Sequence, residues 1–170
     1  LFQGMESERC AAVLPDLETC LSAVRRMDQE LTTSLCRTLV TPIDCEDLKL
    51  LSGHSVRLVR QQTRIARMMA TEGDGGLVEM QKPVVEWAES FARAVSGLPG
   101  KDAKSEAENM RAAVRRALYL LRDERCRLLG GNAEVRGLMR DLARIDVFEE
   151  VMEQMKTVDG DVLRILLKWQ

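Results

Sequence analysis

The sequence predicts an all-α protein, an up-and-down antiparallel bundle of about five long helices. Its composition favours helices over a sheet, because Ala, Leu, Arg, Glu and Met are abundant, aromatic residues make up 4% and prolines number four. Apolar residues recur at steps of three and four positions along nearly the whole chain, which is the period of an amphipathic helix. The breaks between these segments are short, so consecutive helices are expected to lie side by side and antiparallel.

The chain of 170 residues is expected to form one domain over 5–170, because its first four residues, LFQG, look like the remnant of a cleavable tag. No signal peptide follows Met5 and no apolar run approaches the roughly 18 residues that span a bilayer, so a cytoplasmic location is expected. The cysteines are odd in number and scattered, and they are predicted to be buried free thiols: Cys10, Cys20, Cys36, Cys45 and Cys126.

The first helix is expected to begin at Pro15, since a proline followed by Asp16 suits a first turn, and residues 7–13 would form a separate short turn. It should end at Thr41–Pro42, because the residue before a proline is pushed out of the α region. Its apolar face is predicted to contain Leu17, Leu21, Val24, Met27, Leu31 and Leu35.

Four more helices are expected, over 43–71, 77–96, 103–129 and 133–168. The breaks that separate them are EGDGG at 72–76, GLPGKD at 97–102 and Gly130–Gly131, which contain the glycines that commonly terminate helices. Gly160 is a candidate kink in the last helix. The apolar stripe of that helix is predicted to be Val135, Leu138, Leu142, Ile145, Phe148, Val151, Met152 and Met155.

The stretch TPIDCED, which starts at Thr41, reads as the beginning of the second helix. Thr41 suits the N-cap, Pro42 suits the first helical position, and Asp44 at the third can reach back to the cap. Glu46 and Asp47 add negative charge near the positive end of the helix dipole. A metal site is the alternative, but consecutive side chains fan around a helix and give poor geometry for one ion.

The longer stretch TLVTPIDCEDLKLLSG, residues 38–53, resembles the PhoU-like family, whose consensus at this helix junction is close to TFITPIDREDIHALAS. The C-terminal DVLRILLKW also resembles the apolar finish of that family, and the resemblance covers about residues 17–168. It implies an all-α bundle that accompanies a membrane phosphate transporter. The family usually has one further helix before this region, so the resemblance also implies an open helical groove here.

PhoU-like proteins often hold iron or zinc clusters with ExxxD motifs on facing helices, and this chain departs from that pattern. Aligned without gaps from TPID, the acidic positions are occupied by Leu21 and Arg25, Val56 and Arg57, and Ala112 and Arg116. No metal and no other cofactor is therefore expected. His54, the single histidine, is expected to be a surface or capped group and not a metal ligand.

An arginine occupies one position of each of these pairs, and further arginines follow along the second helix. Residues spaced at i, i+3, i+7 and i+10 form a stripe, which we call the arginine ridge: Arg57, Arg60, Arg64 and Arg67. The ridge could be a solvated, salt-bridged face, or it could contact an anion or an acidic partner surface, since guanidinium groups suit phosphate and carboxylate. Arg25 and Arg116 would face the same region in a family-like bundle. Nucleic acid is not expected, because the net charge is −2 and aromatic residues do not alternate with the arginines.

The sequence therefore predicts a protein that is not an enzyme. It contains no Gly-rich phosphate loop, no serine elbow and no histidine partner for a cysteine. The resemblance implies a PhoU-like regulator or accessory of phosphate transport that acts by protein–protein contact, at the membrane periphery through a transporter. The alternative is a structural adaptor that forms a complex through its helices, with a partner helix or a second copy of the chain in the open groove.

Overall fold

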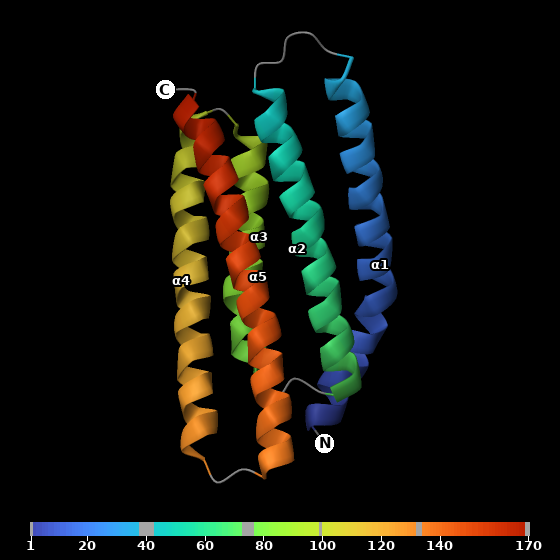
Figure 1. Ribbon diagram of the computed structural model, residues 1–170, viewed down its shortest axis with the longest axis vertical. Helices are drawn as coiled ribbons and strands as arrows, with labels where there is room; N and C mark the ends of the chain where they lie inside the picture. Colours follow the sequence, from blue (N-terminus) through green and yellow to red (C-terminus); the bar gives the residue numbers. More distant parts are fainter. Residues whose placement is uncertain (1, 38–42, 73–76, 99, 132–133, 169–170) are drawn as a thin grey trace.

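The computed structural model describes residues 2–37, 43–72, 77–98, 100–131 and 134–168. The elements in chain order are α1 (Phe2–Leu35), α2 (Cys45–Glu72), the 3₁₀ helix η1 (Leu77–Met80), α3 (Gln81–Ser96), α4 (Lys101–Gly130) and α5 (Val135–Lys168) (Figure 1). The described ranges contain no strand. The predicted all-α bundle of five long helices is confirmed.

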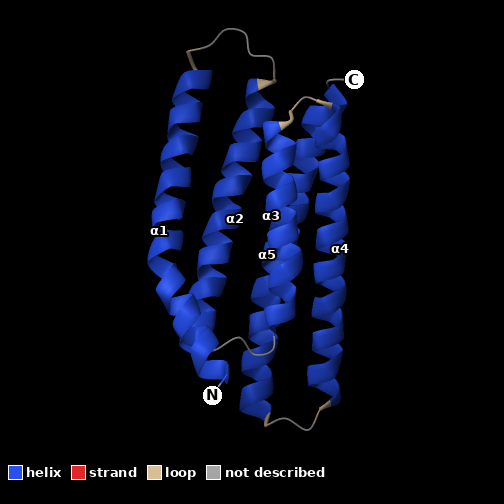
Figure 2. Cartoon of the chain, turned by 180° about the vertical axis from the view of Figure 1, so that it is seen from behind, coloured by secondary structure: helices blue, strands red, loops and turns tan. Residues whose placement is uncertain are grey.

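Four of the helices form the packed part of the bundle and α1 lies outside it. α2 packs against α5, α5 against α4, and α4 against α3, whereas α1 packs against α2 and has no extensive contact with another helix among the described residues. Figures 1 and 2 show α1 and α2 side by side at one edge of the molecule. The buried apolar residues accordingly come from η1 and α2–α5, and no side chain from Ala11 to Leu35 is buried.

α5 is the central helix, because it contacts both α2 and α4. Its apolar stripe is buried as predicted from Ile145 onward, and the helix continues through Gly160 without a break. Earlier in the stripe, Leu138 and Leu142 are half-buried and Val135 is 75% exposed in the first turn. The fully buried apolar residues of α5 are Ile145, Val151, Met152, Met155, Val158, Val162 and Ile165.

The predicted start of the first helix is wrong. α1 begins at Phe2 and passes through Pro15, so residues 7–13 are not a separate turn. A proline inside a helix removes one backbone hydrogen bond and allows a bend, and Figure 2 shows α1 bending in the half that leads to the N-terminus. The predicted apolar face is also too wide, because Met27 is 61% exposed. A helix that packs on one neighbour buries only a narrow stripe.

The other boundaries fall within a few residues of the prediction. η1 precedes α3, and Pro83 is buried in the first turn of α3. Gly97 follows α3, and Gly130 is the last residue of α4. The expected cap at Thr41–Pro42 and most of the EGDGG break lie outside the described residues.

The cysteines are free thiols in the described part of the chain, but the prediction that they are buried is wrong. Cys20, Cys36 and Cys126 are exposed and Cys45 is half-buried. The side chain of Cys10 lies outside the described residues. Helical periodicity could not place these residues, because cysteine occurs on both buried and exposed faces.

Candidate functional site: an arginine-lined cleft

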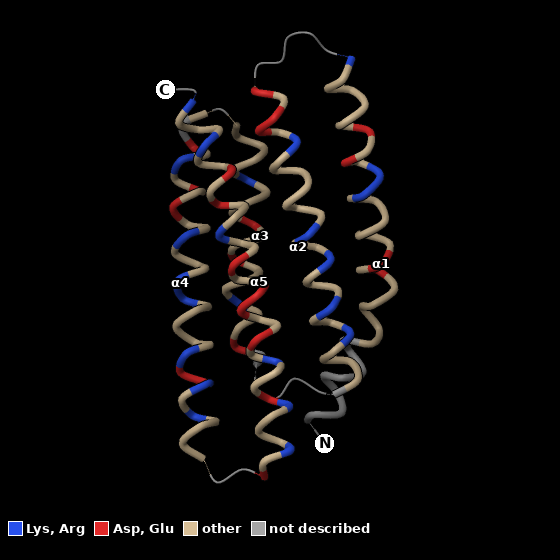
Figure 3. Tube along the Cα trace, in the orientation of Figure 1, with Lys and Arg blue, Asp and Glu red and all other residues tan. Residues whose placement is uncertain are grey.

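The arginine ridge lines a cleft between α1, α2 and α5. The ridge lies on one side of α2, and Leu58, Ile65 and Met69 of the same helix are buried in the core. Figure 3 shows basic residues following one another along the half of α2 that leads to Glu72. The cleft has a volume of about 800 Å³ and is lined by Leu21, Arg25, Arg57, Arg60, Gln61, Thr63, Arg64, Arg67 and Gln154.

Two arginines of the ridge form ion pairs with the helices on either side. Arg64 Nη1 lies 2.8 Å from Glu150 Oε2 on α5, and Arg67 Nη2 lies 2.6 Å from Glu18 Oε1 on α1. All four side chains are more than half exposed, so solvent screens these pairs and each contributes little to stability. Such pairs can exchange one carboxylate for another at small cost.

In the described part of the chain, the other three arginines of the cleft are unpaired. Neither Arg57 nor Arg60 on α2, nor Arg25 on α1, has an ion pair or a hydrogen bond within the described ranges. Their side chains are exposed at the cleft, so their charges face solvent. The cleft therefore contains five guanidinium groups, of which two are paired with carboxylates of the neighbouring helices.

The floor of the cleft contains two polar residues. Thr63 is 2% exposed, and its hydroxyl donates a hydrogen bond to the Val59 carbonyl at 2.9 Å. The side-chain nitrogen Nε2 of Gln154 on α5 is buried and has no hydrogen-bond partner in the described structure. A buried donor without an acceptor is unfavourable by about 1–3 kcal/mol. A rotation of the Gln154 side chain toward the cleft would let this nitrogen donate to an acceptor there.

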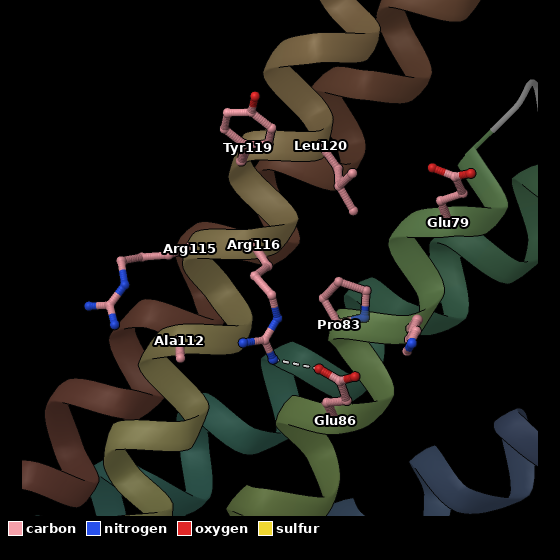
Figure 4. Close-up of a pocket in the computed structure, with 9 residues that line it drawn as sticks. Glu79, Pro83, Glu86, Ala112, Arg115, Arg116, Tyr119 and Leu120 are labelled. Atoms are coloured by element: carbon pink, nitrogen blue, oxygen red, sulfur yellow. Dashed lines mark hydrogen bonds and ion pairs between the residues drawn. The ribbon is translucent and has the colours of Figure 1, made fainter.

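The structure places Arg25 in the cleft, as expected, but the prediction that Arg116 faces the same region is wrong. Arg116 lies on α4 and forms an ion pair with Glu86 of α3 at 2.5 Å (Figure 4). This pair borders a separate pocket of about 1050 Å³ between α3 and α4, where Figure 4 shows Tyr119 pointing away from α3. α4 is separated from α2 by α5, so its arginines cannot reach the cleft.

Sequence reasoning did not find Gln154. A glutamine on a long helix has no periodic signal, and its proximity to α2 depends on the packing of α5. Glu18 and Glu150 were missed for the same reason, although ion pairing of the ridge with acidic residues elsewhere was one of the two alternatives. The structure confirms that alternative for Arg64 and Arg67.

Asp44 and Asp47 of the TPIDCED stretch lie at the start of α2 and attach it to the end of α5. Asp44 precedes the helix, and its Oδ1 accepts a hydrogen bond from the Glu46 backbone N–H at 3.1 Å, so Asp44 is the N-cap and not the third helical residue. Lys168 Nζ lies 3.0 Å from Asp44 Oδ2 and 2.5 Å from Asp47 Oδ2. The pKa of the Asp44 carboxyl group is lowered mainly by the hydrogen bond from Lys168 and to a smaller extent by the hydrogen bond from the Glu46 N–H.

Across the described residues, no three His, Cys, Asp or Glu side chains are grouped to hold a metal ion.

His54 is half-buried and paired, because its Nδ1 lies 2.5 Å from Asp161 Oδ2 on α5. The Asp161 carboxylate is buried, and its other partner, Arg164, lies 3.9 Å away. The contact therefore satisfies a buried carboxylate and connects α2 to α5.

Replacing His54 with alanine is expected to lower the free energy of unfolding by about 1–3 kcal/mol, because the buried Asp161 carboxylate would lose its closest partner. His54→Asn is the matched control, since an asparagine amide nitrogen occupies nearly the position of Nδ1 and can still donate. Urea unfolding of both variants measures the difference. Equal stability of His54→Ala and the unmodified protein would contradict this role.

A second buried polar contact joins α3 to α5. Trp87 Nε1 donates a hydrogen bond to Asp159 Oδ1 at 2.8 Å, and the Trp87 ring stacks on Phe91 with centroids 5.2 Å apart. Burial raises the pKa of Asp159 to about 6, and the Trp87 hydrogen bond and the charge of Arg111 only partly oppose this shift. The carboxyl group is therefore easier to protonate than an exposed aspartate.

No helix in the described part of the chain is both long and apolar enough to cross a membrane. The chain matches no protein-family model, no curated protein and no solved structure.

Proposed function

We propose that this protein is a non-catalytic helical bundle that regulates or accompanies phosphate transport by protein–protein contact. The arginine ridge would dock on an acidic surface of a partner, such as a membrane phosphate transporter. The observation that carries the docking proposal is the row of exposed guanidinium groups, of which Arg57 and Arg60 are unpaired among the described residues. The link to phosphate transport is supported by the resemblance of residues 38–53 to the PhoU-like family.

The charges of the cleft suit an acidic protein surface. Guanidinium groups bind carboxylates with two parallel hydrogen bonds, and a row of like charges accelerates encounter with a partner of opposite charge. Arg64 and Arg67 can exchange Glu150 and Glu18 for carboxylates of the partner, since both pairs are exposed. The lining residues are arginine, glutamine, threonine and leucine, and they provide no general base or nucleophile pair. This composition favours binding over catalysis.

The double substitution Arg60→Glu and Arg64→Glu is expected to abolish recovery of the partner in a pull-down from native cells, because it reverses two charges of the ridge. Arg122→Glu with Arg136→Glu is the matched control, since both arginines are exposed and lie on α4 and α5 away from the cleft. Circular dichroism checks that both variants are folded. Undiminished recovery with the ridge variant would contradict docking through the ridge.

A structural adaptor unrelated to phosphate is the second candidate, and the position of α1 favours it. α1 packs mainly on α2, and its outer side exposes Val13, Cys20 and Met27 at steps of seven residues. Residues spaced by seven lie on one face of a helix, as in coiled-coil contacts. A soluble protein or a second copy of the chain would then be recovered in the same pull-down in place of a transporter.

A further inference from the structure

We propose that the cleft between α1, α2 and α5 binds a short inorganic phosphate chain, with tripolyphosphate as the representative ligand. Arg25, Arg57 and Arg60 would neutralise its charge, and the Gln154 amide would donate to one of its oxygens. This inference goes beyond the proposed function and is linked to it in one respect, because a phosphate chain and an acidic partner would compete for the same arginines.

The charge of the cleft requires an anion with several oxygens. Arg57 and Arg60 are three positions apart on α2, so they are neighbours on the helix surface, and like charges at this spacing repel each other. Arg25 adds a third unpaired guanidinium group from α1. Phosphate oxygens accept paired N–H donors from guanidinium groups, and an anion shared by the three arginines would remove their repulsion.

The lining of the cleft argues against an organic group on this anion. Leu21 is the single apolar lining residue within the described structure, and no lining residue is aromatic. A nucleobase would lack a stacking surface, and a lipid chain would lack an apolar contact. The volume of about 800 Å³ exceeds what one phosphate group needs. These features together favour a short chain of phosphate groups.

Gln154 provides the second, independent observation. Its buried Nε2 has no acceptor in the described structure, and the residue lines the same cleft. When the Gln154 side chain turns toward the cleft, a phosphate oxygen at the floor would accept this N–H, whereas the guanidinium groups nearer the rim would bind the remaining oxygens. The site thus combines exposed guanidinium groups with one neutral donor, the Gln154 amide.

Binding would also hold α1 in place. The polar contacts between α1 and α2 are Arg67 with Glu18 at 2.6 Å and Ser52 with Asp28 at 2.8 Å in the described residues. An anion bound by Arg25 of α1 and by Arg57 and Arg60 of α2 would add a third connection between the two helices. We therefore expect slower amide hydrogen exchange in α1 when tripolyphosphate is bound.

The test is calorimetric titration of the full chain with sodium tripolyphosphate, orthophosphate and citrate at about 150 mM salt, where weak surface attraction is screened. Tripolyphosphate is expected to bind, with orthophosphate at least about tenfold weaker because it reaches fewer guanidinium groups. Arg57→Gln with Arg60→Gln is expected to weaken tripolyphosphate binding about a hundredfold, since each of the two guanidinium groups that the variant removes accounts for about tenfold. Arg122→Gln with Arg136→Gln is the matched control and should bind like the unmodified protein.

Three results would overturn the proposal: no binding of tripolyphosphate, equal binding by the two double variants, or citrate binding as tight as that of tripolyphosphate. Orthophosphate binding of equal affinity would overturn the assignment of a chain. Arg25→Gln is the second variant. Arg25 lies on the outer helix, so the loss of its guanidinium group should weaken binding without unfolding the bundle.

If the pull-down shows docking through the ridge but tripolyphosphate does not bind, this inference fails and the proposed function stands. If tripolyphosphate binds and the Arg60→Glu, Arg64→Glu variant keeps its partner, docking through the ridge fails and the anion site stands.

Discussion

Asp159→Asn is expected to raise the free energy of unfolding at pH 7.5 by about 1–3 kcal/mol. Asp159 is 4% exposed, and its burial raises the pKa of the carboxyl group from the ordinary value of 3.8 to about 6. At pH 7.5 the carboxyl group is ionised in a site that disfavours the charge. Asparagine is neutral and its oxygen can still accept the hydrogen bond from Trp87 Nε1.

The pH dependence of this effect gives the sharper test. Because the pKa of Asp159 is higher in the folded protein than in the unfolded chain, the folded state holds the proton more tightly between about pH 4 and pH 6. The stability contributed by the protonated carboxyl group is complete below about pH 4 and is lost as the pH rises through 6. The difference between Asp159→Asn and the unmodified protein should therefore grow over this range and then stay constant.

Urea unfolding at several pH values between 4 and 8 measures this difference. Asp123→Asn is the control for the chemical change, since Asp123 is exposed on α4 and has no ion pair in the described structure. It should leave the free energy of unfolding within about 0.5 kcal/mol of the unmodified protein. A difference for Asp159→Asn that is the same at pH 4 and pH 8 would contradict the raised pKa.

Phe148→Ala is expected to lower the free energy of unfolding by about 3–5 kcal/mol. Phe148 is 2% exposed on α5, the helix that packs against both α2 and α4, so truncation would leave a cavity in the centre of the bundle. Loss of this size is a large fraction of the roughly 5–15 kcal/mol that holds a typical domain together.

Met139→Ala on the same helix is the matched control, because Met139 is 64% exposed and its truncation creates no cavity. Equilibrium unfolding in urea should show a midpoint shift for Phe148→Ala and almost none for Met139→Ala, with similar slopes for both. A loss below about 1 kcal/mol for Phe148→Ala would mean that the neighbouring helices close the cavity.

The helices themselves could be predicted because their signals are local. The apolar period of 133–168 and the glycines at Gly130–Gly131 predicted α5 and the end of α4 within two residues. The prediction of the first helix start was wrong because it also relied on a local signal. Pro15 favours a helix start, but α1 continues through it as one helix. Asp44, expected at the third helical position, is the N-cap of α2, and its carboxylate also reaches Lys168 at the far end of the chain.

The position of α1 could not be derived from its own residues. Its apolar spacing resembles that of a core helix, yet it packs against α2 at the edge of the bundle, and its apolar side chains from Ala11 to Leu35 are at most half-buried. How many neighbours a helix has depends on the arrangement of all the others, and a hydrophobic pattern records only that one face is apolar. Met27 and Val13 are exposed as a result.

By itself, the sequence determined the all-α class, the order of the helices and the alignment of Arg57, Arg60, Arg64 and Arg67 on one face, because helical geometry relates positions three and four apart. The tertiary structure alone decided which charges meet. It brought Gln154 to the ridge, paired Arg64 with Glu150, and placed Arg116 in a different pocket. These contacts join residues far apart in the chain, so they depend on how the helices pack and not on any local period.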